Sequence, residues 1–301
     1  MSIHQTVLLN ETIDGLNLPA LRLGEKNTSI VVDATFGGGG HSLEICKKYP
    51  TVKIIALDQD KGAFEKAKAK FKNVKCEITF INENFKNLDK ALEEKVNGII
   101  FDLGLSSDQL ENSGRGFSFM KEEPLLMTMK EHPLPEELTA LEVVNNWEEK
   151  NLADIIYGYG EEKFSRRIAK GIVEARKKKS IETTFDLVKI IEESVPAVYR
   201  RGRIHCATKT FQALRITVNN ELGVLKEGLE KGFNGLKLGG RMLVISFHSL
   251  EDRIVKRFFK EKEKKDEARL INKKPIIPTR EEILQNNRSR SAKLRILEKI
   301  K

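Results

Sequence analysis

The chain has 301 residues, of which 40% are hydrophobic and 32% charged, and its formal net charge is +9. This length fits one large domain or two modest ones, with enough apolar residues for a buried core. No apolar run reaches the roughly 18 residues of a membrane span, and the start MSIHQTVLLNE lacks the basic and apolar regions of a signal peptide. We therefore expect a cytoplasmic protein without a membrane partner.

Short apolar runs alternate with helical patterns through the first hundred residues. Strands are expected at 29–33, 53–58, 76–85 and 97–104, and helices at 41–48, 61–72 and 86–95. An acid closes or follows three of the apolar runs, namely Asp33, Asp58 and Asp102. This βαβ spacing predicts a doubly wound, mostly parallel sheet.

The alternation stops after residue 110. Helices are expected at 138–147, 151–159, 161–179 and 184–195, then as one long helix over 208–231, and strand patterns return at 239–249 and 291–299. The pattern predicts an α/β domain made of residues 1–110 and 207–301. An all-helical domain of residues 111–206, large enough to have its own core, is inserted into it.

The positive charge is concentrated in one stretch. Residues 161–215 contain fourteen Lys/Arg against seven Asp/Glu, an excess of seven. A clustered excess of this kind indicates a polyanionic partner, most often nucleic acid, although a solvated and salt-bridged helix face is an equally good interpretation of charge alone.

Cysteines and histidines give no metal or disulfide pattern. Cys46, Cys76 and Cys206 are odd in number and lack the CxxC spacing. We expect unpaired thiols in a reducing compartment and no metal site, because the single histidine of HSLED beside acids is more typical of a helix cap.

Residues 31–42 read VVDATFGGGGHS, with glycine at positions 37 to 40. Loops at the carboxyl ends of parallel strands form the ligand crevice of open α/β sheets, and Asp33, Asp58, Phe85 and Asp102 also fall at such ends. The dinucleotide fingerprint GxGxxG is broken, since Ser42 or Leu43 stands where its third glycine would be. Asp58 suits two ribose hydroxyls, in a nicotinamide cofactor or in S-adenosylmethionine, and the latter needs no pyrophosphate-binding turn.

Further motifs resemble one family nearly from end to end and in collinear order. They are HQTVLLNE (4–11), DATFGGGGHS (33–42), DLGLSSDQLE (102–111), RGFSFM (115–120), YGEEKFSRRIAKGI (159–172), ATKTFQALRITVNNEL (207–222), GGRMLVISFHSLEDRIVK (239–256) and RSRSAKLR (288–295). This set resembles the MraW methyltransferases, the family of ribosomal RNA small subunit methyltransferase H.

The resemblance implies a class I S-adenosylmethionine-dependent, Rossmann-like fold with a helical insertion. It also implies N4-methylation of a cytidine in the decoding region of 16S rRNA in the bacterial cytoplasm. The cofactor contacts that it implies are Gly39, Gly40, His41, Asp58, Phe85, Asp102 and Gln109, to which the glycine-loop analysis adds Asp33 and Gly37. Neither the motifs nor the composition decides between a monomer and a homodimer.

One segment departs from the family pattern. Where the family reads close to PLDMRMD, this chain reads PLLMTMK, so that Leu126, Thr128 and Lys130 replace an acid, an arginine and an acid. The departure keeps open an alternative function, that of a diverged paralogue acting as a non-catalytic RNA-binding or ribosome-assembly protein.

Two residues are predicted to act in catalysis. Asp102 can accept a hydrogen bond from the target amine and steady its departing proton, or it can serve the cofactor alone. His248 can stack on the base or bond to it, or be tied to a backbone carbonyl at the end of a strand. Phe117, Phe119 and Phe247 are further candidates for stacking on an extruded base, and Ser249 is expected to cap the following helix.

Exposed cations of the insertion are predicted to follow the RNA phosphates. They are Arg166, Arg167, Lys170, Lys177, Lys178, Arg200, Arg201 and Arg203.

Overall fold

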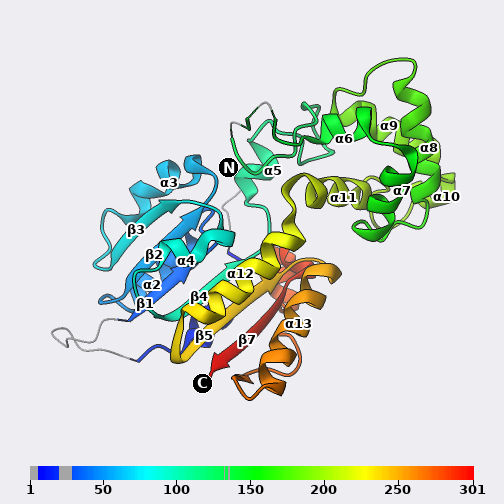
Figure 1. Cartoon of the computed structure of the whole chain (residues 1–301). Helices are drawn as coiled ribbons and strands as arrows, with labels where there is room; N and C mark the ends of the chain where they lie inside the picture. The colour runs from blue at the N-terminus through cyan, green and yellow to red at the C-terminus, as the bar shows by residue number, and fades with distance from the viewer. Residues whose placement is uncertain (1–5, 20–28, 132, 135) are drawn as a thin grey trace. The chain divides into compact units, whose positions relative to one another are not determined.

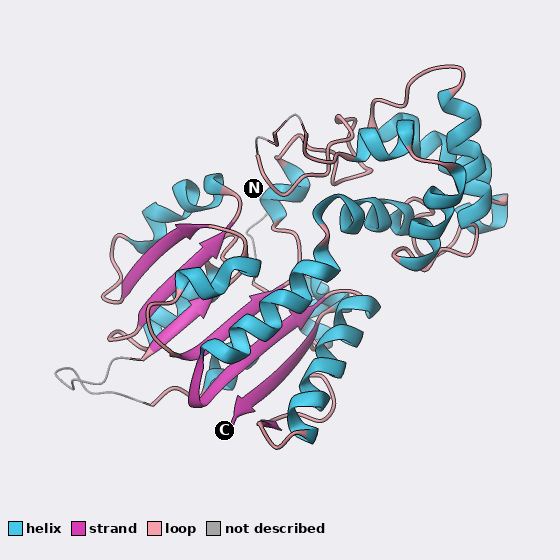
Figure 2. Cartoon of the chain, in the orientation of Figure 1, coloured by secondary structure: helices cyan, strands magenta, loops and turns pink. Residues whose placement is uncertain are grey.

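The computed structural model describes residues 6–19, 29–131, 133–134 and 136–301 (Figures 1 and 2). The chain divides into two compact units, one of Met1–Leu105 with Leu222–Lys301 and the other of Ser106–Glu221. Among the helices in the described ranges, none is long and apolar enough to cross a membrane.

The first unit is built on a seven-stranded sheet with the order β3-β2-β1-β4-β5-β7-β6. Its strands are β1 (Ile30–Asp33), β2 (Lys53–Asp58), β3 (Glu77–Asn82), β4 (Val96–Asp102), β5 (Leu236–Ser246), β6 (Ala268–Leu270) and β7 (Lys293–Lys299). Strands β1 to β5 pair in parallel, whereas β7 is antiparallel to both β5 and β6. The predicted mostly parallel α/β fold is confirmed, and the short β6 is an addition that the sequence pattern did not indicate.

Helices cover both faces of this sheet because its central strands are apolar on both sides. One face packs against α1 (Leu9–Leu16), α2 (Gly40–Lys48) and α3 (Lys61–Lys68). The other packs against α4 (Leu88–Ala91), α12 (Glu221–Gly235) and α13 (Ser249–Lys264), and Figure 1 shows α12 lying along the sheet. Every residue of β1 is buried, as expected for a strand covered on both faces.

Short helices complete the first unit. They are α14 (Arg280–Gln285) and the 3₁₀ segments Ala69–Phe71, Phe85–Asn87 and Asn287–Ser291.

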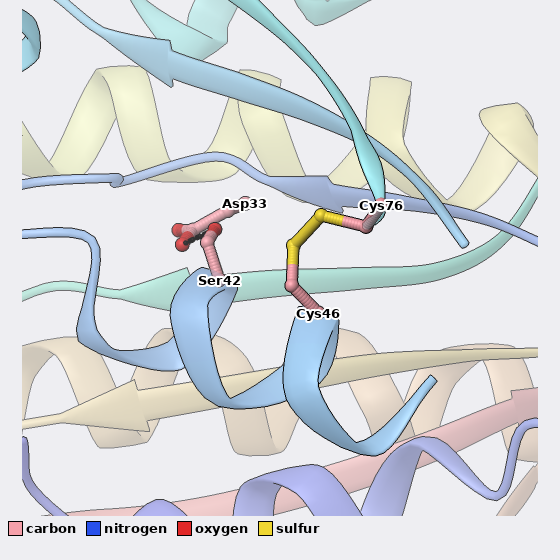
Figure 3. The surroundings of a disulfide bond; sticks show 4 residues. All are labelled: Asp33, Ser42, Cys46 and Cys76. Atoms are coloured by element: carbon pink, nitrogen blue, oxygen red, sulfur yellow. Dashed lines mark hydrogen bonds between the residues drawn. A yellow bond between two sulfur atoms is a disulfide. The ribbon is translucent and has the colours of Figure 1, made fainter. Parts of the chain in front are cut away.

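A disulfide joins α2 to the segment that leads into β3. Cys46 and Cys76 are bonded, with their Cα atoms 5.2 Å apart (Figure 3), whereas Cys206 is a buried free thiol. The expectation of unpaired thiols is therefore wrong for the first two cysteines. Thirty residues separate them, and they meet only because β2 and β3 pair side by side, which the cysteine spacing does not reveal.

The second unit is helical. It comprises α5 (Ser107–Glu111), α6 (Ala140–Asn146), α7 (Glu149–Gly158), α8 (Ser165–Arg176), α9 (Thr184–Ser194), α10 (Ala197–Arg200) and α11 (Thr208–Asn219). Within its described residues β pairing is limited to one isolated bridge between Pro124 and Thr183. Each of the helices α6, α7, α8, α9 and α11 contributes fully buried apolar side chains to a core, for example Val143, Ile156, Ile168, Ile191 and Leu214.

The single long helix expected over 208–231 is instead two helices. Asn220 adopts φ 46° between α11 and α12, a left-handed conformation that asparagine tolerates better than most residues and that ends a helix. The break assigns α11 to the helical unit and nearly all of α12 to the sheet unit. The helical unit consequently extends over Ser106–Glu221 rather than over the expected residues 111–206.

Candidate functional site

Three carboxylates stand at neighbouring strand ends of the sheet unit. Asp33, Asp58 and Asp102 are the last residues of β1, β2 and β4. Parallel pairing aligns β1 with both neighbours, Asp33 lying opposite Ala56 and Ile100. The predicted convergence of the three acids at the carboxyl edge of the sheet is therefore present.

Two of these acids retain unused hydrogen-bonding capacity. Ser42 Oγ donates to Asp33 Oδ2 at 2.6 Å, as the side chains in Figure 3 indicate, and Thr35 Oγ1 accepts from the backbone N–H of Asp102 at 2.6 Å. Oδ1 of Asp33 and Oδ1 of Asp102 are buried without a hydrogen-bond partner among the described residues. Buried acceptors without partners are costly, so the site is suited to a ligand that brings donors or positive charge.

Burial raises the pKa values of all three carboxyls. Desolvation raises the pKa of Asp33 to about 6 and that of Asp58 to about 6. Desolvation, followed by the charge of Asp33, raises the pKa of Asp102 to about 7. Asp102 is therefore divided between its charged and neutral forms near neutral pH, which is the range in which a carboxyl can exchange a proton.

Asp58 fixes the loops on either side of it. Its Oδ2 accepts from the N–H of Gly37 at 2.7 Å, and its Oδ1 accepts from the N–H of Asp60 at 2.8 Å. Each oxygen has a second lone pair for a further donor. The carboxylate thus holds the glycine loop in place while it remains able to accept from ribose hydroxyls.

Contacts and backbone conformations within the protein require glycine in this loop, in addition to any contact with a ligand. Gly37 and Gly39 have φ values of 51° and 72°, which residues with a Cβ rarely adopt. A Cβ on Gly39 would lie 2.5 Å from Cζ of Phe36, and one on Gly40 would lie 1.8 Å from Oγ1 of Thr6. At Gly39 and Gly40 the backbone thus closely approaches the protein's own side chains, and the contact of these glycines with a cofactor stays a prediction.

His41 lies beside Asp102 at the start of α2. Its Nε2 donates to the carbonyl oxygen of Val7 at 3.2 Å, and its Nδ1 lies 3.8 Å from Oδ2 of Asp102. A carbonyl can only accept, so Nε2 carries the proton and a neutral ring turns the lone pair of Nδ1 toward the acid. The structure therefore brings together His41 and Asp102, two residues predicted from separate motifs.

Phe85 and Gln109 have structural contacts of their own. The ring of Phe85 packs edge-on against Phe101 with centroids 5.4 Å apart, and a Cβ on Gly228 of α12 would meet it at 2.5 Å. Gln109 belongs to the helical unit, where its side chain completes the capping box of α5 by accepting from the N–H of Ser106.

His248, not the expected Ser249, is the N-cap of α13. Its Nδ1 accepts from the N–H of Glu251, and the Glu251 carboxylate accepts in return from the N–H groups of Phe247 and His248. The ring is thus tied to a backbone N–H, not to a carbonyl. Phe247 packs against Gly104, where a Cβ would lie 2.8 Å from its ring.

Sequence reasoning did not assign site roles to the partners that orient these residues. Ser42 bonds Asp33, Thr35 bonds the backbone of Asp102, and Glu251 holds the turn after β5. Ser42 and Thr35 lie inside the DATFGGGGHS motif, so their positions were visible, but which acid each one contacts depends on the register of the strands.

The predicted basic residues all have exposed side chains in the helical unit. They are Arg166, Arg167, Lys170, Lys177, Lys178, Arg200, Arg201 and Arg203. Lys170 lies 3.7 Å from Glu174, and Arg167 lies over the ring of Phe164. The neighbouring Arg176 instead donates to the carbonyl of Val144 and so has a structural role.

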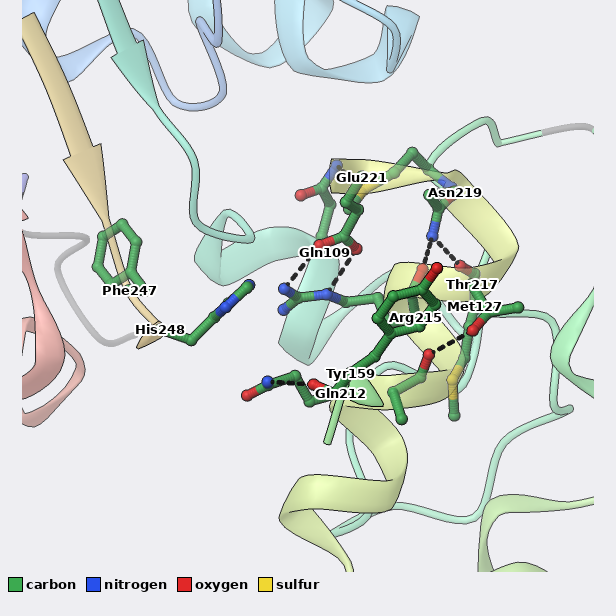
Figure 4. Close-up of polar contacts among 12 residues, drawn as sticks. Gln109, Met127, Tyr159, Gln212, Arg215, Thr217, Asn219, Glu221, Phe247 and His248 are labelled. Carbon is green, nitrogen blue, oxygen red and sulfur yellow. Dashed lines mark hydrogen bonds and ion pairs between the residues drawn. The ribbon is translucent and has the colours of Figure 1, made fainter. Parts of the chain in front are cut away.

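The unusual segment PLLMTMK is an ordered loop held by its own unit. Arg115 donates to the carbonyls of Thr128 and Met129. Asn219 binds Met127 O and the N–H of Met129, and Figure 4 shows its position beside Met127. Thr128 is buried and Lys130 is exposed, and the anchoring bonds are made to backbone atoms of Met127, Thr128 and Met129.

Comparison with known proteins covers the whole chain. A family model described as the MraW methylase family matches residues 1–300. A "Ribosomal RNA small subunit methyltransferase H" of Clostridium botulinum is 47% identical over 99% of this chain and 99% of its own length. Proteins of the same name from Persephonella marina and a Sulfurihydrogenibium species are each 50% identical, over 90% and 97% of this chain and 92% and 98% of their own lengths.

Proposed function

Because this chain belongs to the MraW methylase family and its cofactor is S-adenosylmethionine, we propose that it methylates N4 of a cytidine in the decoding region of 16S rRNA, in the bacterial cytoplasm. The observation that carries the proposal is the buried carboxylate of Asp102, with one oxygen lacking a partner and a pKa raised by burial to about 7. An acid in this state suits the removal of a proton from an amine at neutral pH.

The residues at the strand ends fit the cofactor. Asp58 can accept from the ribose hydroxyls, and the unpartnered oxygens of Asp33 and Asp102 can accept from an ammonium group or face a cationic sulfur. The methyl group on that sulfur supplies the difficult part of the chemistry. The protein contributes by fixing the glycine loop through Asp58 and α2 through the bond from Ser42 to Asp33.

Asp102 is the proposed catalytic residue. The exocyclic amine of cytosine is a poor nucleophile because its lone pair is delocalised into the ring. A carboxylate that accepts a hydrogen bond from this amine localises the pair and can receive the proton that leaves. His41, whose Nδ1 lies 3.8 Å from the same carboxylate, is the proposed positioning residue.

The exposed cations of the helical unit support an RNA substrate. A base inside paired RNA cannot reach a methyl donor, so the target must be unpaired or extruded. Phosphate contacts by arginine and lysine position such a substrate without reading its sequence. The exposed cations Arg166, Arg167, Lys170, Lys177, Lys178, Arg200, Arg201 and Arg203 are the proposed phosphate-binding residues, and His248 is retained as a proposed contact of the base.

The test is mass-spectrometric mapping of methylated cytidines in 16S rRNA from cells with and without the gene for this protein. We expect one cytidine of the decoding region to lose its N4-methyl group in the deletion strain and to regain it when the wild-type gene is restored. Restoration by Asp102→Asn should fail.

Two outcomes would contradict the proposal. An unchanged methylation map would remove the proposed reaction. Full restoration by Asp102→Asn would remove the proposed role of the acid. Bound cofactor without transfer to undermethylated small subunits would instead favour the non-catalytic RNA-binding alternative.

A further inference from the structure

Three aromatic rings of the helical unit form an ordered stack. Phe119 and His205 lie face to face, with ring centroids 4.7 Å apart and planes inclined by 11°. Phe211 of α11 meets Phe119 edge-on at 5.6 Å. Phe211 is buried, Phe119 is half-buried, and the side chain of His205 is 37% exposed, so the histidine is the outermost ring.

Hydrogen bonding fixes the orientation of His205. Its Nδ1 accepts from the N–H of Ala207 at 3.2 Å, which leaves the proton of the neutral ring on Nε2, the nitrogen that lies 3.8 Å from Oε1 of Glu192. With one face on Phe119 and one nitrogen tied to the backbone, the ring is held in place before any ligand arrives.

The same proton arrangement disfavours a metal ion at this position. Ligand atoms of Glu192, His205 and Cys206 lie within 4.8 Å of one another. A metal at Nε2 would displace the proton to Nδ1, where it would oppose the N–H of Ala207. Burial, followed by the charge of Glu192, raises the pKa of the Cys206 thiol, so this ligand also keeps its proton.

The loop that precedes His205 is strongly basic and exposed. Arg200, Arg201 and Arg203 have exposed side chains, and the ion pairs found among the described residues involve none of them. Ile204, between them and the histidine, is 50% exposed. Uncompensated cations beside a preformed aromatic face are the combination by which proteins bind single-stranded nucleic acid.

We propose that an unpaired RNA base stacks on His205 while Arg200, Arg201 and Arg203 bind the adjacent phosphates. The proposal rests on RNA being the substrate, as the proposed function requires, and adds a base contact made by none of the strand-end residues. Because stacking tolerates every base, this contact selects for unpaired RNA rather than for a sequence. A protein partner is disfavoured because residues 196–207, which read PAVYRRGRIHCA, contain no acid that would offset their three arginines.

The test compares His205→Ala, His205→Phe and, as a matched control, Tyr157→Ala, which removes another exposed aromatic ring of the same unit. Dissociation constants are measured for the full chain with a single-stranded RNA oligonucleotide containing 2-aminopurine and with the same oligonucleotide in a duplex. His205→Ala should weaken single-strand binding by about 5- to 150-fold and reduce the quenching of 2-aminopurine. The affinity of His205→Phe for the single strand should be within a few-fold of wild type, and that of Tyr157→Ala should equal wild type.

Salt dependence separates stacking from charge. The slope of log affinity against log salt should be unchanged in His205→Ala. The double variant Arg201→Gln with Arg203→Gln should make the slope shallower by about 1.4, at about 0.7 per phosphate contact for single strands. With undermethylated small subunits, His205→Ala should raise KM while kcat at saturation stays near wild type.

The proposal is overturned if His205→Ala binds single strands as tightly as wild type. It is also overturned if His205→Phe is as weak as His205→Ala while both melt at the wild-type temperature. Methyl transfer by the wild-type protein, measured in the same experiment, distinguishes failure of the base contact from failure of the proposed function. Transfer with normal binding by His205→Ala refutes the base contact alone, whereas absence of transfer refutes the proposed function and leaves the binding comparison valid.

Discussion

Asp102 illustrates how a single carboxyl can be prepared for proton transfer by its surroundings. Its side chain is only 24% exposed, Asp33 ends the adjacent strand, and the charge of Glu251 adds to the same effect. Desolvation and these two like charges all disfavour the ionised form. Because the proposed role requires the ionised form, this residue makes the activity depend on pH.

We expect kcat of the wild-type protein to rise about tenfold per pH unit below pH 7 and to level off above it, since the pKa of Asp102 is raised to about 7. Asp102→Asn should lose at least about 100-fold in kcat at pH 8 and show no inflection near pH 7. The measurement is methyl transfer to undermethylated small subunits from pH 5.5 to 9. An inflection that persists in the residual activity of the variant would assign it to another group.

The same raised pKa predicts how stability changes with pH. Between the usual carboxyl pKa of 3.8 and about 7, the folded protein holds a proton that the unfolded chain releases, so the free energy of unfolding falls as pH rises through this window. Asp102→Asn removes that buried charge and should be more stable than wild type at pH 8, by at most about 1.4 kcal/mol per unit of pKa elevation. Urea unfolding at pH 4 and pH 8 measures this, and equal stability of the two proteins at pH 8 would contradict it.

Gly39 shows that a glycine run need not owe every member to a ligand. Gly39→Ala places a Cβ 2.5 Å from the ring of Phe36 and forces alanine to φ 72°. The left-handed conformation alone costs about 1–2 kcal/mol, so we expect a loss of at least that size in urea unfolding of the cofactor-free protein. Adding Phe36→Leu should recover the part that comes from the ring, and an undiminished loss would assign the whole effect to the backbone conformation.

At the scale of elements, periodicity predicted which segments fold and missed where they end. Apolar runs identified β1, β2 and β4 because their burial on both faces leaves a clear signal. The long apolar stripe of 208–231 concealed the break at Asn220, since a single left-handed residue interrupts a helix without interrupting its hydrophobic pattern. The ring stack of Phe119 and His205 was equally hidden, because its members lie 86 residues apart in the sequence.

The disulfide between Cys46 and Cys76 joins α2 to the segment that leads into β3. Closing a loop of 30 residues restricts the unfolded chain and is worth about 3–4 kcal/mol in the chain-entropy description. In urea unfolding, we expect the free energy of unfolding of the oxidised protein to exceed that of the reduced protein by about this amount. The free energy of unfolding of Cys46→Ala should change little when reductant is added. Alkylation after denaturation should label one thiol per chain before reduction and three afterwards. Three labelled thiols before reduction would show that the pair is not bonded.

At the scale of the whole molecule, chemistry and charge are divided between the two units. The strand-end acids lie in one compact unit, and the exposed cations of residues 161–203 lie in the other. The sequence revealed this division because charge composition needs no knowledge of folding. The sequence does not tell which cations face solvent and which bond within the protein. Arg176, which donates to the carbonyl of Val144, shows that the structure is needed to separate them.

This division predicts a salt dependence that belongs to the helical unit alone. If about five of its cations contact phosphates, log affinity for RNA should fall against log salt with a slope between about −3.5 and −4.5, the lower and upper values being those of single strands and duplexes. Replacing Arg166, Arg167 and Lys170 by glutamine should make the slope shallower by about 2 to 2.7. The control replaces the exposed Lys47, Lys68 and Lys90 of the sheet unit, which changes the net charge equally. If both triple variants alter the slope by the same amount, RNA responds to the total charge of the protein and not to a surface of the helical unit.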